Sequence, residues 1–334
     1  MRTIRMSLLG LAATALVLFP TGGAGASNDP SFKDQWGLGK IGAEAAWTRT
    51  TGAGIRIGIV DTGVDLEHED LAGKVVESIS CVGSGGDPAN CKGSAQDDQG
   101  HGTHVSGIAA AFKDNGKGIA GVAPDAELVV AKVMNAQGTG AGSDVTAGIK
   151  WVVDHGAKVV NISLGDPAQP ITALISENEL KEGVEYAWTR GAIAVLASGN
   201  SGTGLGIEGA NFGDMNAIVV GATGPDDKAA TYSTSTGEAK WAVAAPGGAA
   251  DSTKTNDIYS TFWINGQKNA YTYQAGTSMA APHVSGAVAL LLAQGFSQAD
   301  AVTRLLDTAD KDVGCEATSA TCRGRINVDK ATTK

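Results

Sequence analysis

The chain has 334 residues, with 25 basic and 35 acidic side chains and a formal net charge of −10 at pH 7. This balance argues against nucleic acid as a partner, because phosphate binding relies on clusters of Lys and Arg. The length allows a substantial core, and 47 glycines with few aromatic residues suit tightly packed α/β layers.

The first 26 residues are typical of a secretory signal peptide. Arg2 and Arg5 precede an apolar run at 8–19, and the small residues of Ala24-Gly25-Ala26 suit a cleavage site. The run is shorter than the roughly 20 residues that a membrane-spanning helix needs. We predict a leader over residues 1–26 that is removed on export, and a single domain over residues 27–334. The mature protein is expected to be secreted, extracellular, free of the membrane and monomeric.

Short apolar runs rich in β-branched residues alternate with segments that favour helices. In chain order, the predicted elements are a strand at Ile55–Val60, a helix at His101–Phe112, a strand at Leu128–Val133, a helix at Ser143–His155, a strand at Lys158–Ile162, a helix at Glu177–Arg190, strands at Ala192–Leu196, Ala217–Val220 and Trp241–Ala244, and helices at Ser278–Gln294 and Ser297–Leu306. Such runs indicate strands buried on both faces. The alternation predicts a three-layer α/β fold, with helices on both sides of a central, mostly parallel sheet.

Asp61 ends the first predicted strand and is followed by a glycine turn at Thr62-Gly63. In open α/β sheets, ligands and catalytic groups gather at the carboxyl ends of strands. Taken by itself, this carboxylate is more typical of an Asp that caps an ordinary turn.

A histidine opens the next predicted helix, in the segment Gly100-His101-Gly102-Thr103-His104. A His at a helix start can titrate near neutrality and face a cleft. The i, i+3 spacing of the two histidines could imitate a metal pair, but no HExxH motif or cysteine ligand accompanies it. We expect His104 to be a hydrogen-bonded core residue.

Ser278 stands at the start of an apolar helix built from small residues, with Pro282 expected in its first turn, where a missing N–H costs little. The serine suits a nucleophile, and it equally suits a helix N-cap.

Four cysteines occur as two close pairs, Cys81 with Cys91 and Cys315 with Cys322. Export to an oxidising compartment favours disulfides. Four cysteines can form two disulfides in three different ways, and we predict the one that joins the cysteines of each close pair. Neither pair has the spacing of a zinc site.

The three segments around Asp61, His101 and Ser278 resemble, in the same chain order, the Asp, His and Ser motifs of the subtilisin-like serine peptidase family, nearest to its thermitase-like branch. The resemblance runs from about residue 28 to residue 330. It implies a subtilisin-like fold and a serine endopeptidase that hydrolyses proteins or peptides through an acyl-enzyme on Ser278, with His101 as base and Asp61 as its orienting partner. The alternative is a catalytically inactive relative that binds peptides without cleaving them.

Further segments match the family's binding elements. Asn200, after a predicted strand, resembles the side-chain donor of the oxyanion hole. Two backbone segments are similar to those that hold an extended peptide between them, although both also suit ordinary strand-end loops. Their residues are Gly138, Thr139 and Gly140 in one segment and Ser163, Leu164 and Gly165 in the other.

Resemblance to the thermitase-like branch also implies a structural Ca²⁺ ion, whereas no catalytic cofactor is implied. Ca²⁺ takes six or more oxygen ligands, including backbone carbonyls, so the side chains at some ligand positions are unconstrained. The matching positions are Asp29, Asp70, Phe112, Asn115, Lys117 and Ile119.

Overall fold

The computed structural model describes residues 27–164, 173–174, 177–200, 212–213, 215–311, 313–315 and 319–334. Its centre is an eight-stranded sheet in which the paired strands run parallel. From edge to edge the strands are β12 (Cys322–Arg325), β9 (Trp241–Pro246), β8 (Ala217–Thr223), β7 (Ile193–Ala197), β5 (Val159–Ile162), β1 (Arg56–Asp61), β3 (Glu127–Lys132) and β2 (Val75–Ser80).

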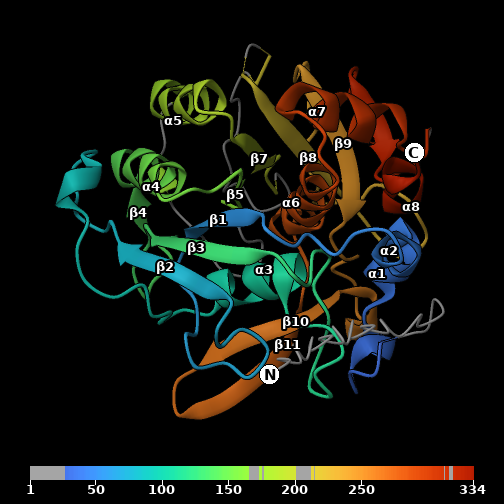
Figure 1. The fold of residues 1–334 in the computed structure, drawn as a ribbon, viewed down its shortest axis with the longest axis horizontal. Helices are drawn as coiled ribbons and strands as arrows, with labels where there is room; N and C mark the ends of the chain where they lie inside the picture. The colour runs from blue at the N-terminus through green and yellow to red at the C-terminus, as the bar shows by residue number, and fades with distance from the viewer. Residues whose placement is uncertain are drawn as a thin grey trace, which may run out of the picture.

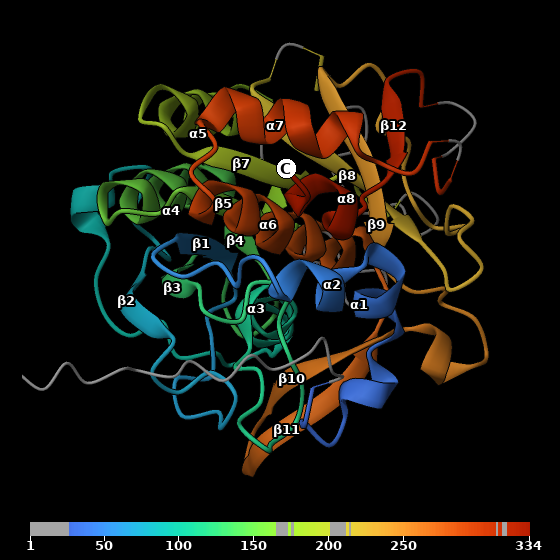
Figure 2. The same ribbon diagram turned by 45° about the vertical axis from the view of Figure 1, so that its right-hand side comes forward.

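Alternate residues of the central strands face two separate cores. Ile57 and Ile59 of β1 belong to a core shared with α3 (His101–Ala110) and α6 (Thr277–Ala293), whereas Val60 belongs to a core shared with α4 (Gly142–Asp154) and α5 (Glu177–Thr189). Figures 1 and 2 show these helix pairs on opposite sides of the sheet. Because both faces are covered, the inner strands are mostly apolar, and this arrangement confirms the predicted three-layer α/β class.

Shorter elements close the fold. The N-terminal α1 (Trp36–Ile41) and α2 (Ala43–Trp47) lie beside the C-terminal α8 (Val328–Thr332), as Figure 1 shows, and α7 (Gln298–Asp307) packs near β9. Ser297 caps α7 by accepting a hydrogen bond from the Asp300 N–H. Single 3₁₀ turns occur at Phe32–Asp34, Pro88–Asn90 and Lys254–Asn256.

An antiparallel hairpin was not predicted from the sequence. It consists of β10 (Ile258–Ile264) and β11 (Gln267–Gln274) and packs against α3 at the bottom of the view in Figure 1. Its turn, Asn265-Gly266, is a strong local signal for a two-residue hairpin that could have identified it. The edge strand β2 was also missed, because half-exposed positions break its apolar run.

Both predicted disulfides are present, Cys81–Cys91 and Cys315–Cys322. Among the described residues, no helix has the length and apolar character required to cross a membrane.

Candidate active site

Asp61 and His101 form a buried pair at the centre of the sheet's carboxyl edge. Asp61 is the last residue of β1 and His101 the first residue of α3, and both side chains are fully buried. His101 Nδ1 lies 2.7 Å from Asp61 Oδ1, which also accepts a 2.7 Å hydrogen bond from the Thr62 N–H. Because a carboxylate oxygen accepts hydrogen bonds, Nδ1 is the donor in the contact with Asp61, and Nε2 is the other ring nitrogen.

Glycine lets α3 approach β1 closely enough for this contact. A Cβ placed on Gly102 would lie 2.1 Å from the Gly63 carbonyl oxygen and 3.1 Å from Asp61 Cβ. Gly63 adopts φ +110°, a conformation that other residues rarely adopt. The glycines that flank the two predicted catalytic residues are therefore needed for close packing.

Ser278 is the second residue of α6, which begins at Thr277. The prediction that Pro282 lies in the first turn is wrong, because five helical residues precede it. Proline has no N–H, so it cannot donate to the carbonyl of the fourth residue before it, which is Ser278. The Ser163 hydroxyl donates to this carbonyl instead, at 2.9 Å, and ties the turn that carries Ser278 to the segment after β5.

A buried chain of polar side chains extends this link. The Ser285 hydroxyl donates to Asn161 Oδ1 at 2.8 Å, and Asn161 Nδ2 lies 2.9 Å from the Ser163 hydroxyl. The three side chains are fully buried, so their hydrogen bonds fix α6 against β5. Sequence reasoning assigned no such role to Asn161 or Ser285; the available signal was an Asn inside an otherwise apolar strand.

Asn200 lies beside the same turn. Its Oδ1 accepts from the Thr277 N–H at 3.0 Å and from the Thr277 hydroxyl at 3.2 Å, and the Gly199 N–H donates to that hydroxyl at 3.1 Å. With the oxygen turned toward Thr277, the amide NH₂ is the donor group of this buried side chain. A loop after β7 thus brings an amide next to Ser278.

Asp61, His101, Asn200 and Ser278 come from four elements that meet at one edge of a parallel sheet. A model of the subtilase family matches residues 52–326, across all four positions. The chain belongs to the subtilase family.

Similar proteins, which align over about nine tenths of this chain, support its assignment to the subtilase family. Thermitase from Thermoactinomyces vulgaris is 39% identical over 305 residues, which cover 91% of this chain and 98% of thermitase. Subtilisin Savinase from Lederbergia lenta is 36% identical, with coverage of 89% and 98%. Among solved structures, a protease from Pseudoalteromonas arctica matches with a TM-score of 0.72 at 26% identity, covering 92% of this chain and 99% of that one. The prediction of a subtilisin-like serine endopeptidase is confirmed.

The predicted peptide-binding segments of this subtilase follow β3 and β5, the two strands that flank β1. Gly140 opens a two-residue strand, β4 (Gly140–Ala141), which pairs with β6 (Ala173–Leu174). Thr139 is held by Asn135, whose Oδ1 accepts from its N–H and its hydroxyl. A surface pocket flanks this segment and is lined by Val82, Asn135, Thr139, Gly140, Ala141, Gly142, Asp144 and Glu179.

The second segment follows β5. Ser163 and Leu164 are buried, and Gly165 lies outside the described residues. The hydroxyl of Ser163 is engaged with the Ser278 carbonyl, so this segment is tied to α6 as well as to the sheet. The glycine-rich loop after Asn200 also lies outside the described residues.

The predicted calcium ligands converge on one loop. Asp29 accepts hydrogen bonds from the N–H groups of Asp114 and Gly116, and Asp70 accepts from Asn115 Nδ2 at 2.9 Å and from the Ile119 N–H at 2.9 Å. Both carboxylates are buried, and burial raises the pKa of Asp70, although hydrogen bonds oppose this shift.

No group of three or more His, Cys, Asp and Glu side chains suited to a metal gathers among the described residues. The ligands predicted from the sequence are two carboxylates, an amide oxygen and backbone carbonyls, and such an all-oxygen set suits Ca²⁺ better than Zn²⁺. Asn115 would have to turn its amide oxygen, which now accepts from the Lys117 N–H, toward the ion.

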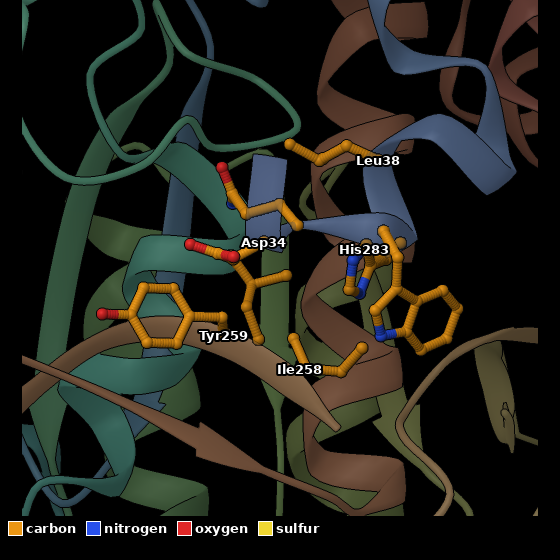
Figure 3. Close-up of a pocket in the computed structure, with 9 residues that line it drawn as sticks. Asp34, Leu38, Ile258, Tyr259 and His283 are labelled. Carbon is orange, nitrogen blue, oxygen red and sulfur yellow. The ribbon is translucent and has the colours of Figure 1, made fainter. Parts of the chain in front are cut away.

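Of the four other histidines, His104 and His283 are buried on α3 and α6. Burial lowers the pKa of His104 to about 3 and that of His283 to about 4. His104 Nε2 lies 3.2 Å from the Thr272 carbonyl, as expected for a core residue. His283 faces a small pocket (Figure 3) that contains no predicted site residue and is lined by Asp34, Gln35, Trp36, Gly37, Leu38, Ile108, Ile258, Tyr259 and His283.

Proposed function

We propose that this subtilase is a secreted endopeptidase that hydrolyses peptide bonds of proteins through an acyl-enzyme on Ser278, with His101 and Asp61 as its partners. The observation that carries the proposal is the buried 2.7 Å contact between His101 Nδ1 and Asp61 Oδ1. A carboxylate in this position holds the imidazole in the tautomer that can accept a proton at Nε2, and it stabilises the imidazolium that results.

The reaction proceeds in two halves. His101 Nε2 takes the proton of Ser278 Oγ while Oγ attacks the carbonyl carbon of the substrate, and the imidazolium then protonates the departing amine as the peptide C–N bond breaks. In the second half, a water molecule loses a proton to the same nitrogen and attacks the acyl carbon. The carboxylic acid is released and the Ser278 hydroxyl is restored.

The oxyanion of each tetrahedral intermediate would be bound by the Asn200 NH₂ group and the Ser278 backbone N–H. Ser278 lies in the first turn of α6, where the helix dipole also favours negative charge. Loss of one such donor typically costs about 3–4 kcal/mol of barrier lowering. The anchoring of Asn200 Oδ1 to Thr277 supports this role, because it keeps the amide next to the nucleophile.

A substrate in extended conformation would add as a strand alongside Gly138, Thr139 and Gly140 and the segment of Ser163, Leu164 and Gly165. Glycine leaves the backbone groups of these segments open, which favours recognition of main chain over side chains. The substrates are therefore proteins or unstructured peptides.

Ca²⁺ would be held by Asp29, Asp70, the Asn115 amide oxygen and the carbonyls of Phe112, Lys117 and Ile119. The ion would neutralise two buried carboxylates and join the N-terminal segment to the loop after α3. Its role is to stabilise the fold, and the reaction does not pass through it. Residues 1–26, with Arg2 and Arg5 before an apolar run, support export.

The test is labelling of the purified chain with a fluorophosphonate probe, followed by profiling of cleaved peptides. Wild type should be labelled and should cleave, whereas Ser278→Ala should do neither. Ser297→Ala, which removes only a helix cap, should still be labelled. A wild type that binds peptides but takes up no probe would refute the proposal and favour an inactive peptide-binding relative.

A further inference from the structure

Asp97 is a buried carboxylate four residues before His101 that the proposed mechanism leaves unused. It is 1% exposed. Its Oδ2 accepts from the Thr103 N–H at 3.0 Å and from the Thr103 hydroxyl at 2.6 Å. Its Oδ1 accepts from the N–H groups of Gln99 and Gly100 at 3.0 and 2.9 Å. One carboxylate therefore holds the residues just before His101 and, through Thr103, the first turn of α3 just after it.

Asp97 is also joined to the strand that carries Asp61. The Thr62 hydroxyl donates to Asp97 Oδ1 at 3.0 Å and accepts from the Gly102 N–H at 2.9 Å. Thr62 directly follows Asp61, and its own N–H donates to Asp61 Oδ1. The Thr62 hydroxyl thus bridges the end of β1 and the start of α3.

We propose that Asp97 is a positioning residue that sets the distance between Asp61 and His101, acting through Thr62; this inference rests on the proposed function. An ordinary helix cap needs hydrogen bonds only to its own helix. Asp97 adds a contact to the partner strand, and its charge at the helix N-terminus stabilises the turn. A carboxylate is required because five donors point at its two oxygens, and an amide offers only one accepting atom.

Replacement by Asn keeps the shape of the side chain but turns one accepting oxygen into a donor. Either the two donors of Thr103, which bond to Oδ2, or the donors that bond to Oδ1 then lose their acceptor. The first turn of α3 is expected to shift relative to β1 as a result. A misplacement of about 1 Å at a catalytic group can lower the rate about 100-fold. We expect kcat of Asp97→Asn to fall by about 10- to 100-fold with KM within about twofold of wild type, because Asp97 touches neither peptide-binding segment.

The experiment measures kcat and KM on a chromogenic peptide, together with the rate of fluorophosphonate labelling and the melting temperature, for the full chain. Asp310→Asn is the matched control, since Asp310 accepts hydrogen bonds from Arg325, Asn327 and Lys330 near the edge strand β12. Four strands separate β12 from β1 in the sheet. The control should lose stability but keep kcat. A folded Asp97→Asn with wild-type kcat and labelling rate would overturn the proposal.

If Asp97→Asn does not fold, two substitutions at Thr62 test whether the bridge from Asp97 to β1 positions His101 and Asp61. Thr62→Val removes the bridging hydroxyl at similar volume and should lower kcat by about tenfold, whereas Thr62→Ser retains the hydroxyl and should restore it. Equal kcat for the Val and Ser variants would overturn the proposal. Failure of wild type to take up the probe would instead refute the proposed function itself.

Discussion

Gly102→Ala should separate His101 from Asp61 with a single added methyl group. Gly102 is the second residue of α3, and its new Cβ would lie 2.1 Å from the Gly63 carbonyl oxygen, whereas ordinary van der Waals contact begins near 3.4 Å. Gly63 has little room to move away, because the Ala95 carbonyl oxygen lies only 2.4 Å from the position that a Cβ on Gly63 would occupy. The start of α3 must therefore move away from β1 by about 1 Å.

A shift of this size removes the alignment that the 2.7 Å contact provides. Near-attack geometry tolerates little displacement, so we expect kcat to fall by about 100-fold. Overpacking of the core should cost about 1–3 kcal/mol of unfolding free energy, partly offset by the roughly 1 kcal/mol by which Ala is a better helix former than Gly.

The assay is steady-state kinetics together with urea unfolding of the same preparation. Gly39→Ala is the matched control, because Gly39 lies in α1 with no atom within 4 Å of an added Cβ. This control should keep wild-type kcat and gain up to about 1 kcal/mol of stability. If Gly102→Ala folds and keeps kcat within about threefold of wild type, the packing explanation is refuted.

Three further outcomes are expected. Burial lowers the pKa of His104 to about 3 and that of His283 to about 4, so both are neutral in the folded protein and take up protons on unfolding below about pH 6.5. The free energy of unfolding measured in urea should therefore fall between pH 7 and pH 4, by about 3 kcal/mol from His283 alone. A free energy that does not change with pH would contradict this. Replacing Cys81 and Cys91 together by Ser opens a link across 10 residues and should cost about 2.5 kcal/mol, seen as a lower melting temperature; an unchanged midpoint would contradict it. Chelation should lower the melting temperature and added Ca²⁺ should restore it, whereas indifference to both would refute the calcium site.

Local pattern predicted the positions of the central strands, because each is buried on both faces and is mostly apolar. β8 and β9 begin at the predicted residues, Ala217 and Trp241, but extend beyond their predicted ends to Thr223 and Pro246. The bounds of β1, β3, β5 and β7 lie within one residue of prediction. The hairpin was missed, because its strands mix polar and aromatic residues and lie partly exposed.

The sequence by itself determined the residue types of the site, their order along the chain and the two local cysteine pairs, since each depends on neighbours a few positions away. Only the tertiary structure decided that Ser163 supports the carbonyl freed by Pro282, across 115 positions, and that Thr62 bridges to Asp97, across 35. Such contacts depend on which strands lie side by side. The placement of β1 between β5 and β3 follows from the packing of the whole chain, and no local pattern encodes it.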